Sequence, residues 1–226
     1  MGEHRPLHSY QLGLVPYREA WALQRRLVEA RKQDLIPDTV LLLEHPPVIT
    51  LGRDGSRASL VKSEEEIQRA GVELVESDRG GDATYHGPGQ LVVYPIIDLK
   101  PDRKDVRRYV RGLEEVMIQL LADFGLIAGR RDGAPGVWLN EPARKLGALG
   151  ARLSRWVTQH GFALNLQPDL SHFELIIPCG LRGLGVSSVA AELGHAVDLG
   201  ATSKRAAEYL AAHFERELTH CEGAPV

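Results

Sequence analysis

The chain has 226 residues, of which 43% are hydrophobic and 25% are charged, and its formal net charge is −3. These values are ordinary for a soluble globular protein and suit one domain spanning residues 1–226, with no bulk attraction to nucleic acid. Because the N-terminus lacks the apolar stretch of a secretory signal and no run approaches ~20 apolar residues, we expect a cytoplasmic protein without a membrane partner.

Strand and helix patterns alternate through the first third of the chain. A helix is predicted over Pro16–Lys32, with Pro16 suited to its first turn, and a second helix should be capped by Ser63 and begin with three glutamates. Apolar runs predict strands at Leu7–Val15, Thr39–Glu44, Val48–Leu51 and Val72–Ser77.

After a glycine-rich loop from Arg79 to Gln90, the remaining elements are unevenly spaced. A long helix is expected from Asp105 to Phe124, ended by Gly125, and Thr202 or Ser203 could cap a final helix to about Leu218. Further strands are predicted at Leu91–Leu99, Val137–Leu139, Lys145–Leu153 and Val157–Leu166. This order indicates an α+β fold with a mixed or antiparallel sheet and flanking helices.

The long helix carries a basic stripe. At about 100° per residue one narrow face combines Lys104, Arg107, Arg108 and Arg111. The opposite face combines Val106, Val110, Leu113 and Met117. A solvated outer face is the ordinary explanation of such a stripe, and a docking surface for an acidic partner is the alternative.

The glycine-rich loop contains four glycines between two predicted strands. Glycine reaches positive φ and lets a ligand lie against the main chain, so the loop could wrap an extended substrate or serve as an irregular connection. It lacks the Gly-Lys-Ser/Thr ending of a phosphate-binding loop, and no helix pattern follows it, which disfavours phosphate binding.

Two side chains suggest acyl chemistry. Cys179 follows the apolar run Ile176-Ile177-Pro178 and precedes a glycine, a turn that could present a nucleophilic thiol if a base or cation lies nearby. Lys145 is one of only six lysines, and the small uncharged residues after it could bury its amine and favour the neutral form. A buried structural cysteine, a Cys179–Cys221 disulfide and a surface lysine are the alternatives.

Taken together, these segments resemble the octanoyltransferase family of lipoate biosynthesis, whose signature reads Arg-Gly-Gly-x-x-Thr-Tyr-His-Gly-Pro-Gly-Gln. Residues 79–90 match every fixed position of that signature. The resemblance continues in order through residues 145–150, 160–165, 178–180 and 185–188. It is carried by about residues 35–194, and the segments outside this range add little to it.

The resemblance implies an α+β fold like the catalytic domains of biotin and lipoate protein ligases. It implies Cys179 as the nucleophile that forms an acyl thioester, and Lys145 as its general acid/base. Acyl-substrate contacts are implied for Arg79, Gly80, Gly81, Asp82, Ala83, Thr84, Tyr85, His86, Ala148, Leu149, Gly150, Gly161, Phe162 and Ala163.

The activity that the resemblance implies is transfer of an octanoyl or lipoyl group from acyl carrier protein to a lysine of lipoyl domains. The partners would be octanoyl-acyl carrier protein, the lipoyl domains of 2-oxoacid dehydrogenase complexes and the glycine cleavage H protein. Because a thioester donor is already activated, we expect no ATP, no metal and no other cofactor.

Four alternatives remain at this stage. An ATP-dependent lipoate or biotin ligase could share the fold, and a cysteine hydrolase could pair Cys179 with His86 or His160. A noncatalytic acyl-binding module would need neither the thiol nor the lysine. A zinc site joining Cys179 to His86, His160 and His172 is conceivable from the ligand types, although their spacing forms no recognised pattern.

Overall fold

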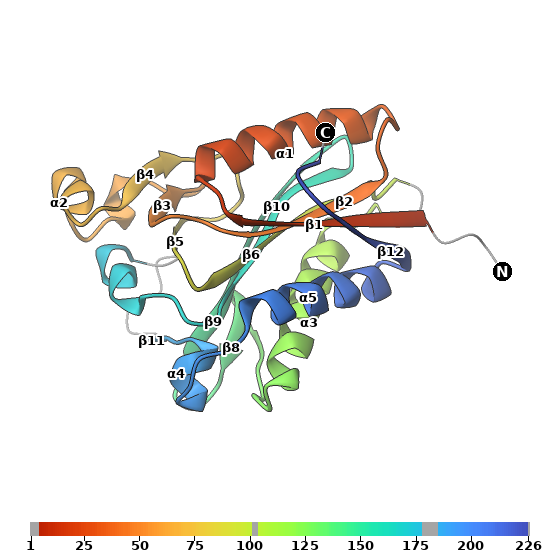
Figure 1. The fold of residues 1–226 in the computed structure, drawn as a ribbon. Coiled ribbons are helices and arrows are strands. Elements are labelled where there is room, and N and C mark those ends of the chain that lie inside the picture. Colours follow the sequence, from red (N-terminus) through yellow and green to blue (C-terminus); the bar gives the residue numbers. More distant parts are fainter. Residues whose placement is uncertain (1–4, 101–103, 178–184, 226) are drawn as a thin grey trace.

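The computed structural model describes residues 5–100, 104–177 and 185–225. Within these ranges the chain forms a nine-stranded mixed sheet and a three-stranded sheet, flanked by helices (Figure 1). The large sheet has the order β12-β1-β2-β6-β10-β9-β8-β7, with β11 beside β9, and the small sheet has the order β4-β3-β5. The predicted α+β class is confirmed.

The strands and helices have the following bounds. The large sheet contains β1 (Arg5–Leu14), β2 (Asp38–Glu44), β6 (Gln90–Ile96), β7 (Gly129–Arg131), β8 (Ala134–Leu139), β9 (Arg144–Ser154), β10 (Val157–Asn165), β11 (Gly185–Val186) and β12 (Arg216–Cys221). The small sheet contains β3 (Val48–Leu51), β4 (Glu73–Glu76) and β5 (Ala83–His86). The helices are α1 (Tyr17–Lys32), α2 (Glu64–Arg69), α3 (Val106–Asp123), α4 (Val189–Leu193) and α5 (Leu199–His213), with 3₁₀ turns at Arg57–Ser59 and Leu170–Leu175.

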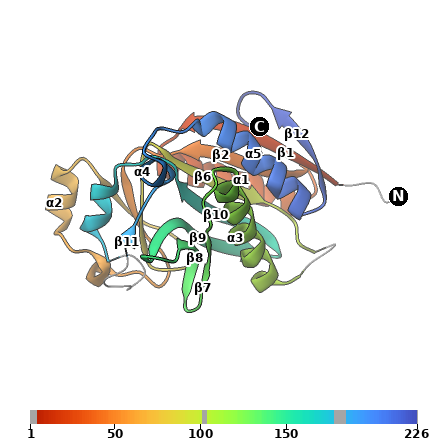
Figure 2. The ribbon, with the colours of Figure 1, turned by 90° about the horizontal axis from the view of Figure 1, so that it is seen from below.

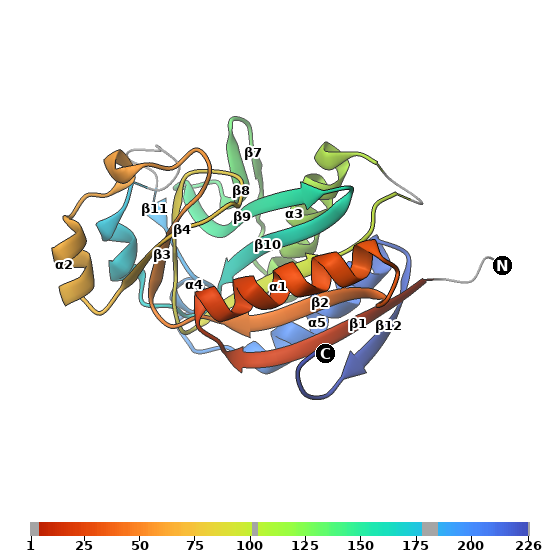
Figure 3. The same ribbon diagram turned by 90° about the horizontal axis from the view of Figure 1, so that it is seen from above.

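Helices cover both faces of the large sheet. Helix α1 lies on one face (Figure 3), and α3 and α5 lie on the other (Figure 2). Strand β2 lies inside the sheet and is buried on both faces, which explains its continuous apolar run. Val40 and Leu42 pack towards α3 and α5, whereas Leu41 and Leu43 pack towards α1. The small sheet extends the molecule beyond the N-terminal end of α1 (Figure 3).

Local sequence signals account for most helix starts. Ser63 and Glu66 form the reciprocal pair of hydrogen bonds of a capping box at the start of α2. Asp105 accepts a hydrogen bond from the backbone N–H of Arg108 and caps α3, and Gly125 follows that helix with φ of 75°. No helix among the described ranges combines the length and the apolar content needed to cross a membrane.

The C-terminal prediction was wrong in two respects. The cap of α5 is Asp198, whose carboxylate accepts the backbone N–H of Ala201. Thr202 and Ser203 lie inside the helix, where their hydroxyls donate to the carbonyls of Asp198 and Leu199. The helix ends at His213, and the residues after it form β12, which pairs in parallel with β1.

Three further predictions need correction. Residues 83–86 of the glycine-rich loop form strand β5, which pairs with β3. Lys104 precedes α3, so it lies outside the helical stripe, while Arg107, Arg108 and Arg111 are exposed as predicted. Val106 is 45% exposed and does not join the apolar face of the helix.

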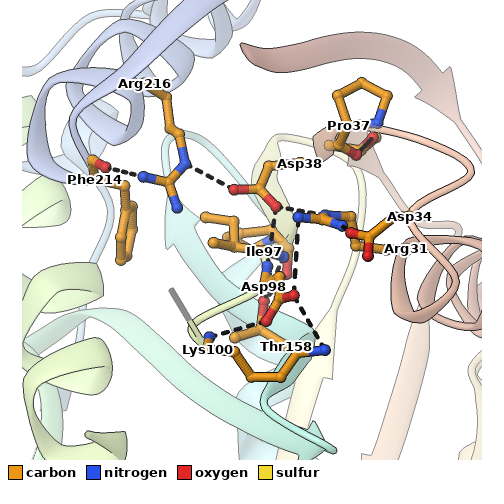
Figure 4. A network of polar contacts seen from close by, with 12 residues as sticks. Arg31, Asp34, Pro37, Asp38, Ile97, Asp98, Lys100, Thr158, Phe214 and Arg216 are labelled. Atoms are coloured by element: carbon orange, nitrogen blue, oxygen red, sulfur yellow. Dashed lines mark hydrogen bonds and ion pairs between the residues drawn. The ribbon is translucent and has the colours of Figure 1, made fainter. Parts of the chain in front are cut away.

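A buried carboxylate ties distant parts of the large sheet together (Figure 4). Asp38, at the start of β2, accepts hydrogen bonds from Arg31 Nε at 2.8 Å and Arg216 Nε at 2.7 Å. It also accepts the backbone N–H of Asp98 at 3.0 Å. The end of α1, the segment after β6 and the C-terminal strand therefore converge on one side chain that is 1% exposed.

We predict that Asp38→Asn strongly destabilises the protein, because two arginines would remain buried without their shared countercharge. The free energy of unfolding should fall by about 3–5 kcal/mol, the usual loss when one member of a buried ion pair is removed. Urea unfolding followed by circular dichroism measures the change. Asp34→Asn is the control, since Asp34 also pairs with Arg31 but its side chain is 78% exposed; equal losses in the two variants would contradict the prediction.

Candidate active site

A cavity opens where the small sheet meets the large one. Strand β5 and the loop before it form one wall, and β6, β9, β10 and the first residue of α1 form the others. Its empty volume, counted to the open mouth, is about 500 Å³. The lining residues are Tyr17, Arg79, Gly81, Asp82, Ala83, Thr84, His86, Tyr94, Lys145, Ala148, Leu149, Gly150, His160, Gly161, Phe162 and Ala163.

The structure brings together nearly all of the site residues that the sequence predicted. Lys145 lines the same cavity as the predicted substrate contacts, of which Gly80 and Tyr85 are absent from the lining. Cys179 lies outside the described residues, so its contact with Lys145 stays a prediction. Tyr17 and Tyr94 join the lining from outside the sequence motifs.

Alternation along β5 explains the position of Tyr85. Successive side chains of a strand point to opposite faces, and Ala83 and Tyr85 pack into the core of the small sheet. Thr84 and His86 are left to face the cavity. The Tyr85 hydroxyl lies 2.8 Å from His172 Nδ1, and its ring contacts Phe173 edge to face, so Tyr85 fastens the 3₁₀ turn at Leu170–Leu175.

Arg79 braces the loop that forms one cavity wall. The Arg79 side chain is buried and donates to four groups, which are Thr50 Oγ1 and the backbone carbonyls of Thr50, Gly80 and Asp82. A guanidinium presents five N–H donors in a fixed plane, so one side chain can hold several turns of irregular backbone. Arg79 therefore shapes the loop in addition to lining the cavity.

Glycines allow the backbones around the cavity to approach closely. A Cβ on Gly150 would lie 2.6 Å from the carbonyl oxygen of Gly80, and a Cβ on Gly161 would lie 2.2 Å from that of Val93. Both distances are far below van der Waals contact. Gly80 in turn donates its N–H to the carbonyl of Ala151 at 3.2 Å, which holds the loop against β9.

Lys145 is buried, as its small neighbours in the sequence predicted. The residue is 8% exposed, and its Nζ lies 5.2 Å from the centroid of the Trp138 ring. Gly136 backs the side chain, because a Cβ there would be 2.6 Å from Lys145 Cε. The amine therefore lies in a slot made by an aromatic ring and a bare backbone, at the wall of the cavity.

Histidines near the cavity are held in the neutral form by burial. Desolvation lowers the pKa of His86 to about 3 and that of His45 to about 4. Burial also lowers the pKa of His160, although Asp78 lies 2.7 Å from its Nε2 and opposes the shift. His160 has φ of 58°, an unusual value for a residue with a side chain, and Gln24 accepts its backbone N–H.

A metal centre receives no support from the part of the chain that the structure describes. Those residues contain no group of three His, Cys, Asp or Glu side chains placed to hold an ion. His172 Nδ1 is engaged with Tyr85. The zinc alternative and the disulfide alternative both include Cys179, which lies outside the described residues, and Cys221 is a free thiol.

The sequence is similar to a family of lipoyl-attaching enzymes and to octanoyltransferases of two bacteria. The model of the lipoyl protein ligase A/B catalytic domain matches residues 16–212. An octanoyltransferase of Myxococcus xanthus is 48% identical over 92% of this chain, although the chain spans only 59% of that protein. An octanoyltransferase of Roseiflexus sp. is 49% identical over 94% of this chain and 89% of its own length.

The fold is similar to a solved bi-partite lipoate protein ligase from Thermoplasma acidophilum. The TM-score is 0.76, over 97% of this chain and 88% of the Thermoplasma chain, at 14% sequence identity. At that identity the likeness extends to the fold alone.

We predict that the protein loses stability as the pH falls below about 6.5. His45 has a lowered pKa of about 4 in the folded state, so between these values the unfolded chain binds a proton that the folded chain does not. The free energy of unfolding should therefore fall with a slope of up to about 1.4 kcal/mol per pH unit for this group. Urea unfolding between pH 7 and pH 5 measures it.

His45→Gln should flatten this pH dependence, and replacement of the exposed His195 by Gln is the control that should leave it as in the wild type. A His45→Gln protein whose stability changes with pH as steeply as the wild type would contradict the assignment.

Proposed function

Because the chain belongs to the octanoyltransferases of the lipoyl protein ligase A/B catalytic-domain family, we propose that it makes an octanoyl-Cys179 thioester and passes the acyl group to a protein lysine. The observation that carries this proposal is the burial of Lys145 in the wall of a largely apolar cavity. A poorly solvated amine can act as a proton acceptor near neutral pH, which a surface lysine cannot.

The first half-reaction forms the thioester. Lys145 takes the proton of the Cys179 thiol as the sulfur attacks the octanoyl thioester carbonyl. The carbon–sulfur bond to the phosphopantetheine arm of acyl carrier protein then breaks, and the departing thiolate takes the proton back from Lys145. The products are octanoyl-Cys179, a free carrier thiol and a neutral lysine.

The cavity lining suits the acyl chain. Ala148, Leu149, Phe162 and Ala163 contribute apolar walls. Gly150 and Gly161 add backbone without side chains, which leaves a smooth surface along which an extended hydrocarbon chain can lie. Arg79 and the loop that it braces form the wall that adjoins β9.

The proposed donor is octanoyl-acyl carrier protein, and the proposed acceptors are the lipoyl domains of 2-oxoacid dehydrogenase complexes and the glycine cleavage H protein. A thioester donor already carries the free energy that amide formation needs. The reaction therefore requires neither ATP nor a metal, whereas a ligase must first activate a free acid. The curated relatives at 48% and 49% identity favour the transferase over the ligase, and the shared fold does not discriminate between them.

We predict that the purified protein octanoylates a lipoyl domain from octanoyl-acyl carrier protein without ATP, and that Lys145→Arg lowers the rate by at least about 100-fold. Arginine is always protonated and therefore cannot accept the thiol proton. Mass spectrometry of the lipoyl domain measures the product. Activity that appears only with free octanoate and ATP would support the ligase, and release of free octanoate would support a hydrolase.

A basic patch on α3 and β7 is the proposed carrier-docking surface. It consists of Arg107, Arg108 and Arg111 on α3 together with Arg130 on β7, which surround one shallow hollow. One turn further along α3, the buried Glu114 accepts the backbone N–H of Gly136, the residue that backs Lys145. Helix α3, which carries the patch, is therefore linked to the surroundings of Lys145 through Glu114 and Gly136.

We predict that the double variant Arg107→Glu and Arg108→Glu raises the apparent KM for octanoyl-acyl carrier protein at least about 10-fold, because it removes attraction to an acidic partner and adds repulsion. The matched control is Arg25→Glu with Arg26→Glu, a pair of exposed arginines on α1, which covers the opposite face of the sheet. Steady-state kinetics at two salt concentrations measures both doubles. Equal KM values would exclude docking at this patch.

A further inference from the structure

A continuous series of hydrogen bonds links His86 in the cavity wall to the backbone of Lys145. His86 Nδ1 lies 2.6 Å from Gln90 Oε1, and Gln90 Nε2 donates to Asn165 Oδ1 at 2.8 Å. Asn165 Nδ2 donates to the carbonyl of Ser187 at 3.0 Å, and the Ser187 N–H donates to the carbonyl of Lys145 at 3.0 Å. We refer to these four contacts as the His86 relay.

The relay determines which nitrogen of His86 carries the proton. Both N–H groups of Gln90 are occupied, one with Asn165 Oδ1 and one with the carbonyl of Tyr85 at 3.2 Å. Gln90 Oε1 can therefore only accept, so His86 Nδ1 must donate. The orientation of Asn165 agrees, because its Nδ2 faces a carbonyl. His86 Nε2 is left as a lone-pair acceptor.

The surroundings of His86 keep this state in place. Its ring is stacked on Tyr17 at 6.2 Å between centroids and meets the edge of His45 at 5.7 Å. The residue is 6% exposed and lines the same cavity as Lys145. Because burial lowers its pKa to about 3, the ring stays neutral at physiological pH and Nε2 keeps its lone pair.

The two half-reactions differ in their need for such an acceptor. In the first, the octanoyl thioester has no N–H or O–H at its reacting centre, and the thiol proton goes to Lys145. In the second, the attacking lysine amine brings two N–H groups that must be turned away from the carbonyl so that its lone pair faces the carbon. Lys145 can take one of these protons, and the other needs a separate acceptor.

We propose that His86 Nε2 accepts a hydrogen bond from the attacking amine of the target lysine and orients it for the second half-reaction. This inference rests on the proposed acyl-Cys179 function. The amine nitrogen forms a bond to the acyl carbon, the carbon–sulfur bond to Cys179 breaks, and one amine proton passes through Lys145 to the cysteine thiolate. His86 takes no net proton and keeps the same tautomer throughout.

Two variants of His86 separate its two nitrogens. Asn places an amide near the position of Nδ1, so His86→Asn can still bond Gln90 but offers nothing at the position of Nε2. Gln reaches further, so His86→Gln can present an oxygen near the position of Nε2 but leaves Gln90 without its histidine partner. The pair thus separates the contact with the amine from the contact with the relay.

The test measures the half-reactions separately by single-turnover kinetics. Rapid quenching and intact-protein mass spectrometry follow acylation by octanoyl-acyl carrier protein and then transfer to a lipoyl domain. We expect His86→Asn to slow transfer by about 100-fold and acylation by less than about 5-fold. His86→Gln should recover at least about 10-fold of the lost transfer rate.

Three outcomes would count against the inference. Equal slowing of both half-reactions by His86→Asn would show that His86 merely supports the fold of the site, and a normal transfer rate would show that the amine does not use it. A His86→Gln protein slower in transfer than His86→Asn would assign the effect to the relay instead. A wild-type enzyme that forms no acyl adduct at all would overturn the proposed function, and this inference with it.

Discussion

The site depends on the close approach of two backbones, the loop after β4 and strand β9. The carbonyl oxygen of Gly80 lies 2.6 Å from the position that a Cβ of residue 150 would take, and the Gly80 N–H donates to the carbonyl of Ala151. Only glycine at position 150 permits this contact, and the contact holds the small sheet against the large one. The cavity is the space that remains beside it, which is why its lining comes from both sheets.

A second constraint is that the buried polar groups around the cavity need hydrogen-bond partners. Arg79 satisfies the carbonyls of the loop, and the His86 relay satisfies polar groups between β6, β10 and the residues before α4. Burying such groups is costly unless each finds a partner. The same hydrogen bonds also fix the tautomer of His86 and hold the backbone of Lys145. One set of contacts therefore stabilises the buried polar groups and positions the two side chains for the proposed reaction.

Much of the fold could be predicted because its signals are local. The capping box at Ser63, the apolar run of β2 and the glycine after α3 each act within a few residues. Strand β12 could not be predicted in this way, since it is defined by pairing with β1 and by the ion pair of Arg216 with Asp38, both at long range. Likewise, Thr202 and Ser203 were predicted as caps because their hydroxyls are common at helix starts, whereas the structure begins the helix earlier, with Asp198 accepting the backbone N–H of Ala201.

The site residues that lie within the sequence motifs could be predicted, and those outside the motifs could not. The burial of Lys145 and the gathering of the 79–86 loop with β9 and β10 agree with the sequence, whereas Tyr17 and Tyr94 reach the cavity through packing that no motif records. Tyr85 points away from the cavity because residues 83–86 form strand β5. The sequence did not predict this strand, because it lies within the glycine-rich segment.

The most direct test of the account is intact-protein mass spectrometry after mixing the protein with octanoyl-acyl carrier protein in the absence of ATP. We predict one octanoyl adduct on the wild type, none on Cys179→Ala, and loss of the adduct when a lipoyl domain is added. An adduct that persists on Cys179→Ala, or transfer to the lipoyl domain without any adduct, would contradict it.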